Sequence, residues 1–177
     1  CPFIELPGVA VLGINTARSL TFKDGRINRD QVNFIRETFD RTPADAVRIL
    51  VTHHPLFALT VDGEVERAVG RQELALGAVE DSRVDVLLAG HAHHASSQDA
   101  GDLVTRSGGV LVVQAGTATS TRVRHQEQSF NTIDIADGRV AISVHGWDGA
   151  AFTAAEARPY EYQDGRWRVL EAEEPAH

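Results

Sequence analysis

The chain has 177 residues, a length that suits one domain or one part of a larger domain. Its composition, 42% hydrophobic and 24% charged, is usual for a globular fold and excludes disorder along the whole chain. The formal net charge of −8 disfavours general nucleic-acid binding, because an acidic surface repels a phosphate backbone. No apolar run approaches the ~18 residues of a membrane helix, so we expect no membrane-spanning segment.

The single cysteine, Cys1, excludes an internal disulfide and a cysteine-rich zinc site. Its place at the first position favours the end of a fragment, with a lipid-attachment residue left by signal processing as the alternative. No signal or transit pattern is visible. We therefore predict a cytoplasmic location, and export stays open.

The first half of the chain alternates strand and helix patterns. Residues 9–14 form a short apolar run of strand length, and residues 47–52 form a second. Between them, Asn28 is placed to cap a helix that buries Val32, Ile35 and Phe39, with Gln31 completing a capping box. Residues 66–80 have a second helical pattern, and residues 84–88 form a third apolar run. This order predicts right-handed βαβ units, with the second and third strands as parallel neighbours joined by the helix at 66–80.

The pattern changes after about residue 103. Strands are predicted at 109–114, 130–135, 140–145, 151–162 and 167–170, and the Asp-Gly pairs at 137–138 and 164–165 are strong hairpin signals. We therefore predict one domain over residues 1–177, with an α/β part at 8–100 and an antiparallel part at 101–177.

Five of the eight histidines fall in two clusters, at His53 and His54 and at His91, His93 and His94. Each cluster follows a predicted parallel strand, where open α/β sheets place their ligand sites. The spacing between the clusters is that of one crossover, so they converge if the two strands are neighbours. Imidazoles that converge in this way suit Zn²⁺, Mn²⁺ or Fe. A lone histidine at a strand end is usually a structural hydrogen-bonding group, and we assign no role to the isolated His125, His145 and His177.

The residues around both clusters resemble the last two motifs of the calcineurin-like metallophosphoesterases. These are Val51 to Pro55 (VTHHP) and Ala89 to His93 (AGHAH). Residues 13–19 (GINTARS), followed by Gly25 to Ile27 and Gln31, resemble the bacterial cyclic-nucleotide phosphodiesterase branch. The resemblance covers roughly residues 8–145. It implies an α/β fold in which a mixed-sheet sandwich is flanked by helices.

The resemblance also implies a site with two divalent metal ions, Mn, Fe or Zn. By the motif match, His53 and His91 bind one ion and His93 binds the other, while His54 and His94 face the substrate or support the ligands. The implied substrate is a phosphate ester. A phosphodiester such as a cyclic nucleotide is the leading substrate class, and a phosphomonoester is the close alternative. Phosphate contacts by Arg18, Arg122 and Arg124 stay open, since surface arginines are usually solvated.

Three further motifs of that family have no counterpart in this sequence: Asp-x-His, Gly-Asp, and Gly-Asn-His followed by Asp or Glu. The chain therefore resembles the C-terminal half of such an enzyme and lacks the acidic ligands and the acid-catalyst histidine. We expect a missing N-terminal half or another chain to supply them, and a homo-oligomer stays open. The alternative function is a non-catalytic regulatory or interaction module that retains the histidines and binds at most one metal weakly.

Overall fold

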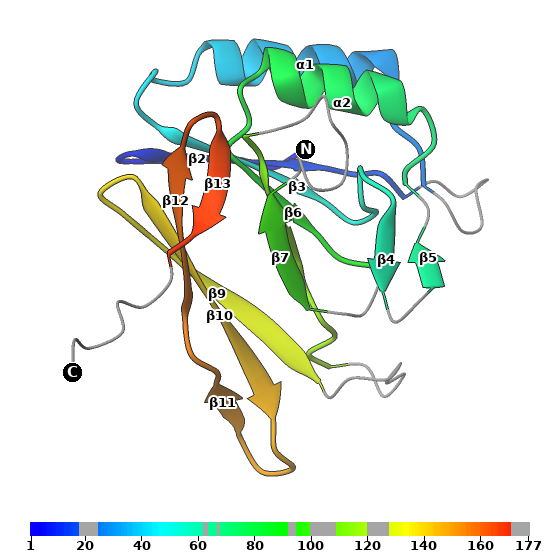
Figure 1. The fold of residues 1–177 in the computed structure, drawn as a ribbon. Helices are drawn as coiled ribbons and strands as arrows, with labels where there is room; N and C mark the ends of the chain where they lie inside the picture. The colour runs from blue at the N-terminus through cyan, green and yellow to red at the C-terminus, as the bar shows by residue number, and fades with distance from the viewer. Residues whose placement is uncertain are drawn as a thin grey trace.

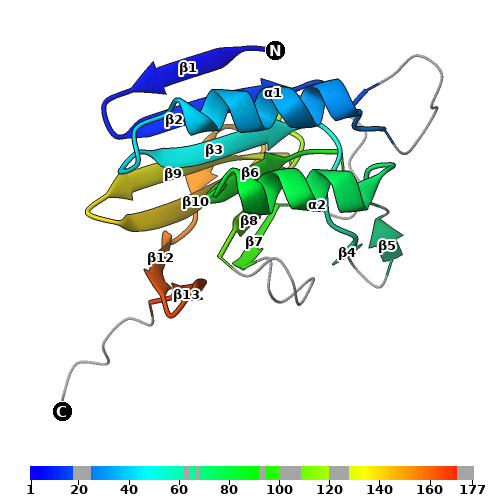
Figure 2. The same cartoon turned by 90° about the horizontal axis from the view of Figure 1, so that it is seen from above.

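The computed structural model describes residues 1–17, 25–61, 64–66, 68–91, 95–99, 109–119 and 128–170. In this part of the chain the elements form three layers. Two helices cover one face of a six-stranded sheet, and a five-stranded sheet packs against the other face (Figures 1 and 2). The prediction of a mixed α/β fold with two sheets is thereby confirmed.

The six-stranded sheet has the order β1-β2-β3-β6-β8-β7. Its central strands β2, β3, β6 and β8 are parallel, whereas β1 and β7 are antiparallel to their neighbours at the two edges. The strands are β1 (Phe3–Leu6), β2 (Val9–Ile14), β3 (Val47–Thr52), β6 (Val86–Ala89), β7 (Ser96–Asp99) and β8 (Leu111–Gln114). The covering helices are α1 (Arg29–Asp40) and α2 (Gln72–Asp81).

The second sheet is antiparallel throughout. Its strand β10 pairs with β9 on one side and with β11 and β12 on the other, and β12 also pairs with β13. The strands are β9 (Ser129–Ala136), β10 (Arg139–Trp147), β11 (Phe152–Ala154), β12 (Arg158–Gln163) and β13 (Arg166–Val169). A separate hairpin contains β4 (Leu59–Val61) and β5 (Glu64–Glu66).

The predicted βαβ arrangement is confirmed, because β3 and β6 pair in parallel with α2 between them in the chain. The predicted cap of α1 also forms. The Gln31 N–H donates to Asn28 Oδ1 at 2.8 Å, and the Asn28 N–H donates to Gln31 Oε1 at 3.0 Å. Both groups are end groups of the helix that would otherwise need solvent or another partner.

Other predicted bounds were wrong. The second helix begins at Gln72 rather than at residue 66, because residues 64–66 pair as β5 and Arg71 has φ +67, outside the right-handed helical region. The predicted strand at 151–162 is two strands, β11 and β12. The short strands β1 and β7 were not predicted, and they are assigned through their pairing with β2 and β8.

The six-stranded sheet separates two hydrophobic cores. The core on the helix side contains Ala10, Leu12, Ile35, Phe39, Leu50 and Leu87 among its buried residues. The core between the sheets contains Ile49, Val86, Leu111, Val113, Val140, Ile142, Tyr160 and Trp167. Alternation along each strand directs successive side chains to opposite cores.

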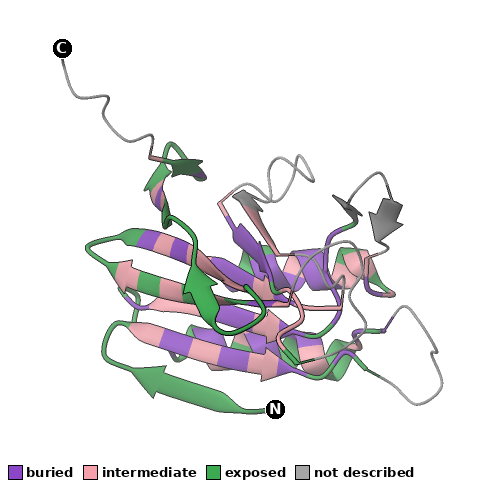
Figure 3. Ribbon diagram, turned by 90° about the horizontal axis from the view of Figure 1, so that it is seen from below, coloured by how far each residue is buried: buried purple, intermediate pink, exposed green. Residues whose placement is uncertain are grey.

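The core between the sheets ends before it reaches β1. One register row runs through Ile4, Val11, Ile49, Val86 and Leu111 on five adjacent strands. Exposure along this row falls from 56% at Ile4 to 6% at Ile49 and 0% at Val86 and Leu111, with Val11 intermediate. In the view from below, β9 is the last strand of the second sheet on this side, and β1 and β2 extend past it (Figure 3). The apolar face of β1 and β2 therefore lacks the cover that β3 and β6 have.

Among the described residues, no helix is long and apolar enough to cross a membrane. The cytoplasmic location and the single-domain division of the chain stay predictions.

Candidate metal centre

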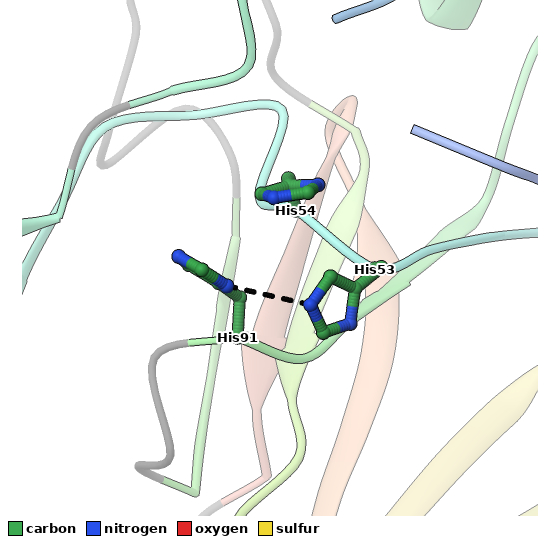
Figure 4. A group of neighbouring side chains, drawn as sticks. All are labelled: His53, His54 and His91. Atoms are coloured by element: carbon green, nitrogen blue, oxygen red, sulfur yellow. Dashed lines mark hydrogen bonds between the residues drawn. The ribbon is translucent and has the colours of Figure 1, made fainter. Parts of the chain in front are cut away.

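His53 and His91 meet where β3 and β6 end. His53 follows the last residue of β3, and His91 comes after Gly90, just beyond β6. The Gly90 N–H donates to the His53 carbonyl oxygen at 3.1 Å, which ties the two strand ends together. His53 Nε2 lies 3.4 Å from His91 Nδ1 (Figure 4). The parallel pairing thus brings together two side chains that belong to separate clusters in the sequence.

The backbone at His91 is held in an unusual conformation. Its φ is +71°, a value that is sparsely populated for residues other than glycine and that is often found at functional sites. The turn before it is supported by Gln114, which is 1% exposed at the end of β8. With its NH₂ toward β6, the Gln114 carboxamide donates to the carbonyl oxygens of Ala89 at 3.2 Å and Gly90 at 3.0 Å. Buried hydrogen bonds from the neighbouring strand therefore support the strained segment.

His54 is buried and points to the same region as His53 and His91 (Figure 4). Its Nδ1 lies 3.0 Å from Thr16 Oγ1, and its backbone N–H donates to the same oxygen at 3.0 Å. The Thr52 hydroxyl donates to the His54 carbonyl oxygen at 2.9 Å. Gly25 packs so closely against the ring that a Cβ there would overlap His54 Nδ1. Thr16, just after β2, and Gly25, before α1, thus contact this imidazole, and Thr52 at the end of β3 fixes its backbone.

The three imidazoles suit a metal ion by their chemistry and by their spacing. His53, His54 and His91 each offer one nitrogen, and these atoms lie within 4.8 Å of one another. Two nitrogens bound to one tetrahedral ion at about 2.1 Å lie about 3.4 Å apart. The separation between His53 and His91 matches that value. Among the described residues, no Asp or Glu joins this group, so the donor set there is neutral.

The structure thus brings together three of the five histidines of the two predicted clusters. His53 and His91 approach each other as expected, and their roles as ligands stay predictions. His93 and His94 lie outside the described residues, as do Arg18, Arg122 and Arg124. His145 lies on the second sheet, where Nε2 is 3.0 Å from Thr132 Oγ1 and the ring stacks on Phe130.

Sequence reasoning missed the residues that support the site. Thr16 and Gly25 belong to the segments that resemble a family motif, but the sequence assigns them no structural role, and Gln114 has the pattern of an ordinary strand residue. One available signal was the polar side chain at the end of an apolar strand, which both Gln114 and Thr52 provide. The contacts that matter join residues far apart in the chain, which spacing alone does not show.

No protein-family profile and no curated protein sequence matches the chain. Solved structures do. A purple acid phosphatase from yellow lupin has a TM-score of 0.60 at 12% identity, covering 89% of this chain and 32% of the other. A dimetal phosphatase from Danio rerio has a TM-score of 0.53 at 15% identity, covering 69% and 36%. GAP50, the anchor in the inner membrane complex of Plasmodium, has a TM-score of 0.55 at 12% identity, covering 93% and 50%.

These similarities establish a metallophosphoesterase-like fold, which confirms the predicted fold class. The chain spans between about a third and a half of the length of these three structures. At such low identity the likeness is one of fold alone, and chemistry must be argued from the site.

Proposed function

We propose that this chain forms the histidine side of the active centre of a metal-dependent phosphoesterase. The observation that carries the proposal is the 3.4 Å approach of His53 Nε2 and His91 Nδ1 at the carboxyl ends of two adjacent parallel strands. In open α/β sheets this edge is where ligands bind. A purple acid phosphatase and a dimetal phosphatase are among the solved structures of similar fold, so this fold is compatible with the proposed chemistry.

The proposed ligands follow the sequence motifs. His53 and His91 hold one ion, His93 holds the second, and His54 and His94 face the substrate. When bound, Mn, Fe or Zn ions neutralise phosphate oxygens and make a bound water more acidic. The protein's own contribution is to fix the ligands. The Gly90–His53 hydrogen bond and the Gln114 carboxamide hold the two strand ends in place before any ion arrives.

The proposed substrate is a phosphodiester, with a cyclic nucleotide as the leading example, and a phosphomonoester is the alternative. The resemblance of residues 13–19 to the cyclic-nucleotide branch supports this choice. Loops that border the site decide between such substrates, whereas the metal ligands set the reaction.

We further propose that the acidic ligands come from a strand-forming segment other than residues 1–177, corresponding to the N-terminal half of such an enzyme. Two divalent ions held close together need carboxylate oxygens, and no Asp or Glu joins the described cluster. The exposed side chains of Ile4 and Leu6 support this proposal, because with the half-buried Val9 and Val11 they continue the core between the sheets. In the described part of the chain, β9 pairs only with β10, so its other edge is open to a further strand.

Metal content and turnover of two preparations test this proposal. The 177-residue chain alone should bind at most about one Zn²⁺ or Mn²⁺ and should not hydrolyse bis-p-nitrophenyl phosphate. Co-expression with the part of a related phosphodiesterase that carries the Asp-x-His, Gly-Asp and Gly-Asn-His motifs should raise the content to two ions and give turnover. Turnover by the chain alone, with no other polypeptide detectable by mass spectrometry, would contradict the assignment.

A non-catalytic interaction module is the second candidate. The neutral donor set of the described cluster favours it, and so does the similarity in fold to GAP50, which is described as an anchor. A module of this kind would show neither two-ion binding nor turnover in the co-expressed complex.

A further inference from the structure

Thr16 lies two residues after the end of β2, and its hydroxyl contacts His54 twice. It accepts a hydrogen bond from the His54 backbone N–H at 3.0 Å, and it lies 3.0 Å from His54 Nδ1. Thr16 is 0% exposed, so water does not reach this hydroxyl. In the described part of the chain these two groups are its hydrogen-bond partners.

The hydroxyl has one proton to donate, and the two contacts decide where that proton goes. The His54 backbone N–H is itself a donor, so it cannot accept. His54 Nδ1 can accept only if it carries no proton. The reverse arrangement, with Nδ1–H donating to Thr16, would leave a fully buried hydroxyl proton with no acceptor among the residues that the structure describes, which is unfavourable. The arrangement that satisfies every group has Thr16 donating to Nδ1, and the ring proton of the neutral imidazole then lies on Nε2.

We infer that Thr16 is a positioning residue that holds His54 in the Nε2–H form, so that His54 serves as a hydrogen-bond donor at the centre rather than as a metal ligand. A nitrogen that carries a proton has no lone pair to give to an ion. The three clustered imidazoles therefore divide into two kinds: His53 and His91 can coordinate, and His54 donates. This part of the inference rests on the proposed function: the group that accepts the hydrogen bond from His54 is an oxygen of a phosphate ester.

The packing around His54 preserves this arrangement. Gly25 has φ +53 and lies so close that a Cβ would overlap the ring at Nδ1 and Cγ, which blocks a movement of the imidazole toward residue 25. The Thr52 hydroxyl holds the His54 carbonyl at 2.9 Å, which fixes the backbone next to the ring. An imidazole confined at Nδ1 and anchored through its backbone presents its donor with little further loss of conformational freedom on substrate binding.

Nitrogen NMR of the ¹⁵N-labelled 177-residue chain, without metal, tests the inference directly. His54 Nδ1 should give an acceptor-type signal and Nε2 a protonated, pyrrole-type signal. Addition of Zn²⁺ should shift the His53 and His91 signals and leave the His54 pattern in place. A protonated His54 Nδ1, or a His54 Nε2 signal that shifts on metal binding like those of His53 and His91, would overturn the inference.

Variants separate a positioning role from a merely structural one. Thr16→Val removes the donor to Nδ1, so His54 should populate both ring forms, its Nε2 should become sensitive to Zn²⁺, and Zn²⁺ affinity should rise. Thr16→Ser should restore the original pattern. If Thr16 only stabilised the fold, Thr16→Val would lower the Zn²⁺ affinity and Thr16→Ser would make no difference to the ring form.

The Zn²⁺ affinity of histidine variants is a second test of which imidazoles bind the metal ion. His53→Ala and His91→Ala should each weaken Zn²⁺ binding by about 100-fold or more, while His54→Gln should change it by less than about threefold. Equal losses for all three would show that His54 is a ligand. If the NMR pattern of His54 holds but none of these variants alters Zn²⁺ binding, the proposed function and the phosphate target fail, while the inference that Thr16 sets the ring form of His54 stands.

Discussion

Backbone hydrogen bonds connect neighbouring parallel strands at both ends, but in the described part of the chain the clustered histidines lie at the carboxyl ends. At the amino ends, the Val47 N–H donates to the Gly8 carbonyl at 2.9 Å, and the Leu111 N–H donates to the Asp85 carbonyl at 2.8 Å. Asp85 adds a carboxylate bond, accepting from the Arg48 N–H at 2.7 Å. A cavity of about 430 Å³ opens at this end, lined in part by Arg48, Asp85 and Tyr162.

The carboxyl ends carry the polar side chains that could perform chemistry: Thr16 after β2, His53 and His54 after β3, His91 after β6, and Gln114 at the end of β8. His91 has a left-handed backbone there, and so does Gly25, which lies before α1 and packs against His54. Substitutions at this end should therefore affect ligand binding as well as stability, and substitutions at the amino ends should affect stability alone. Four predictions test this contrast.

The largest effect is expected at His91. In the co-expressed complex proposed above, His91→Ala should lower turnover by orders of magnitude, because a bound ion supplies several kcal/mol of transition-state charge stabilisation. The matched control is His145→Ala, which removes an imidazole from the second sheet and should leave turnover unchanged. Steady-state hydrolysis of bis-p-nitrophenyl phosphate measures both, and equal rates for the two variants would contradict the ligand assignment.

The next effect concerns Gly25. Gly25→Ala should destabilise the chain by about 2 kcal/mol or more, because it adds an overlap with His54 to the cost of a left-handed residue. Gly138 is the control, since it has φ +74 and a Cβ added there would meet nothing within 4 Å. Gly138→Ala should cost only about 1 kcal/mol. Urea unfolding followed by circular dichroism compares the two variants. Equal losses in the free energy of unfolding would show that the His54 ring can move aside at little cost.

A smaller effect is expected at Gln114. Gln114→Leu removes the donors to the Ala89 and Gly90 carbonyls and should lower the free energy of unfolding by about 1–2 kcal/mol. It should also weaken Zn²⁺ binding by about tenfold, because the turn before His91 loses its support. The exposed Gln163→Leu should change stability by less than about 0.5 kcal/mol and leave Zn²⁺ binding unaltered. A Gln114 variant that loses stability but keeps full Zn²⁺ affinity would show that Gln114, like residues at the amino ends of the strands, affects stability alone.

The smallest effect belongs to Asp85 at the amino ends. Burial raises the pKa of this carboxyl, and the hydrogen bond and charge of Arg48 oppose the rise without cancelling it. Because the folded-state pKa exceeds the unfolded value, the stability linked to this group is present below the unfolded pKa and is lost as pH rises through the folded pKa. Relative to wild type, Asp85→Asn should therefore gain stability as pH increases from about 4 toward neutrality.

Unfolding midpoints of both proteins at several pH values measure this change. A difference that stays constant with pH would contradict the assignment to Asp85. Zn²⁺ affinity should be the same in both proteins, since Asp85 lies at the end of the strands opposite the histidines.

The local elements could largely be predicted from the sequence. The apolar runs at 9–14 and 47–52 became strands at the predicted residues, and Asn28 and Gln31 formed the expected capping box. These features depend on short-range effects, namely strand-length burial and hydrogen bonds between residues three apart. The approach of His53 and His91 also followed, because a crossover of this length joins neighbouring parallel strands.

Only the tertiary structure decided how the site is supported and where the sheets end. Strands β1 and β7 carry weak signals of their own and exist through pairing with β2 and β8. The Thr16–His54 contact joins β2 to the end of β3, and the Gln114 contact joins β8 to the end of β6. Likewise, the uncovered side chains of Ile4 and Leu6 look like ordinary strand residues in the sequence. Residues distant in the chain determine which strands pair, which buried groups receive a hydrogen bond and which sheet face is covered. No local sequence pattern therefore predicts these features.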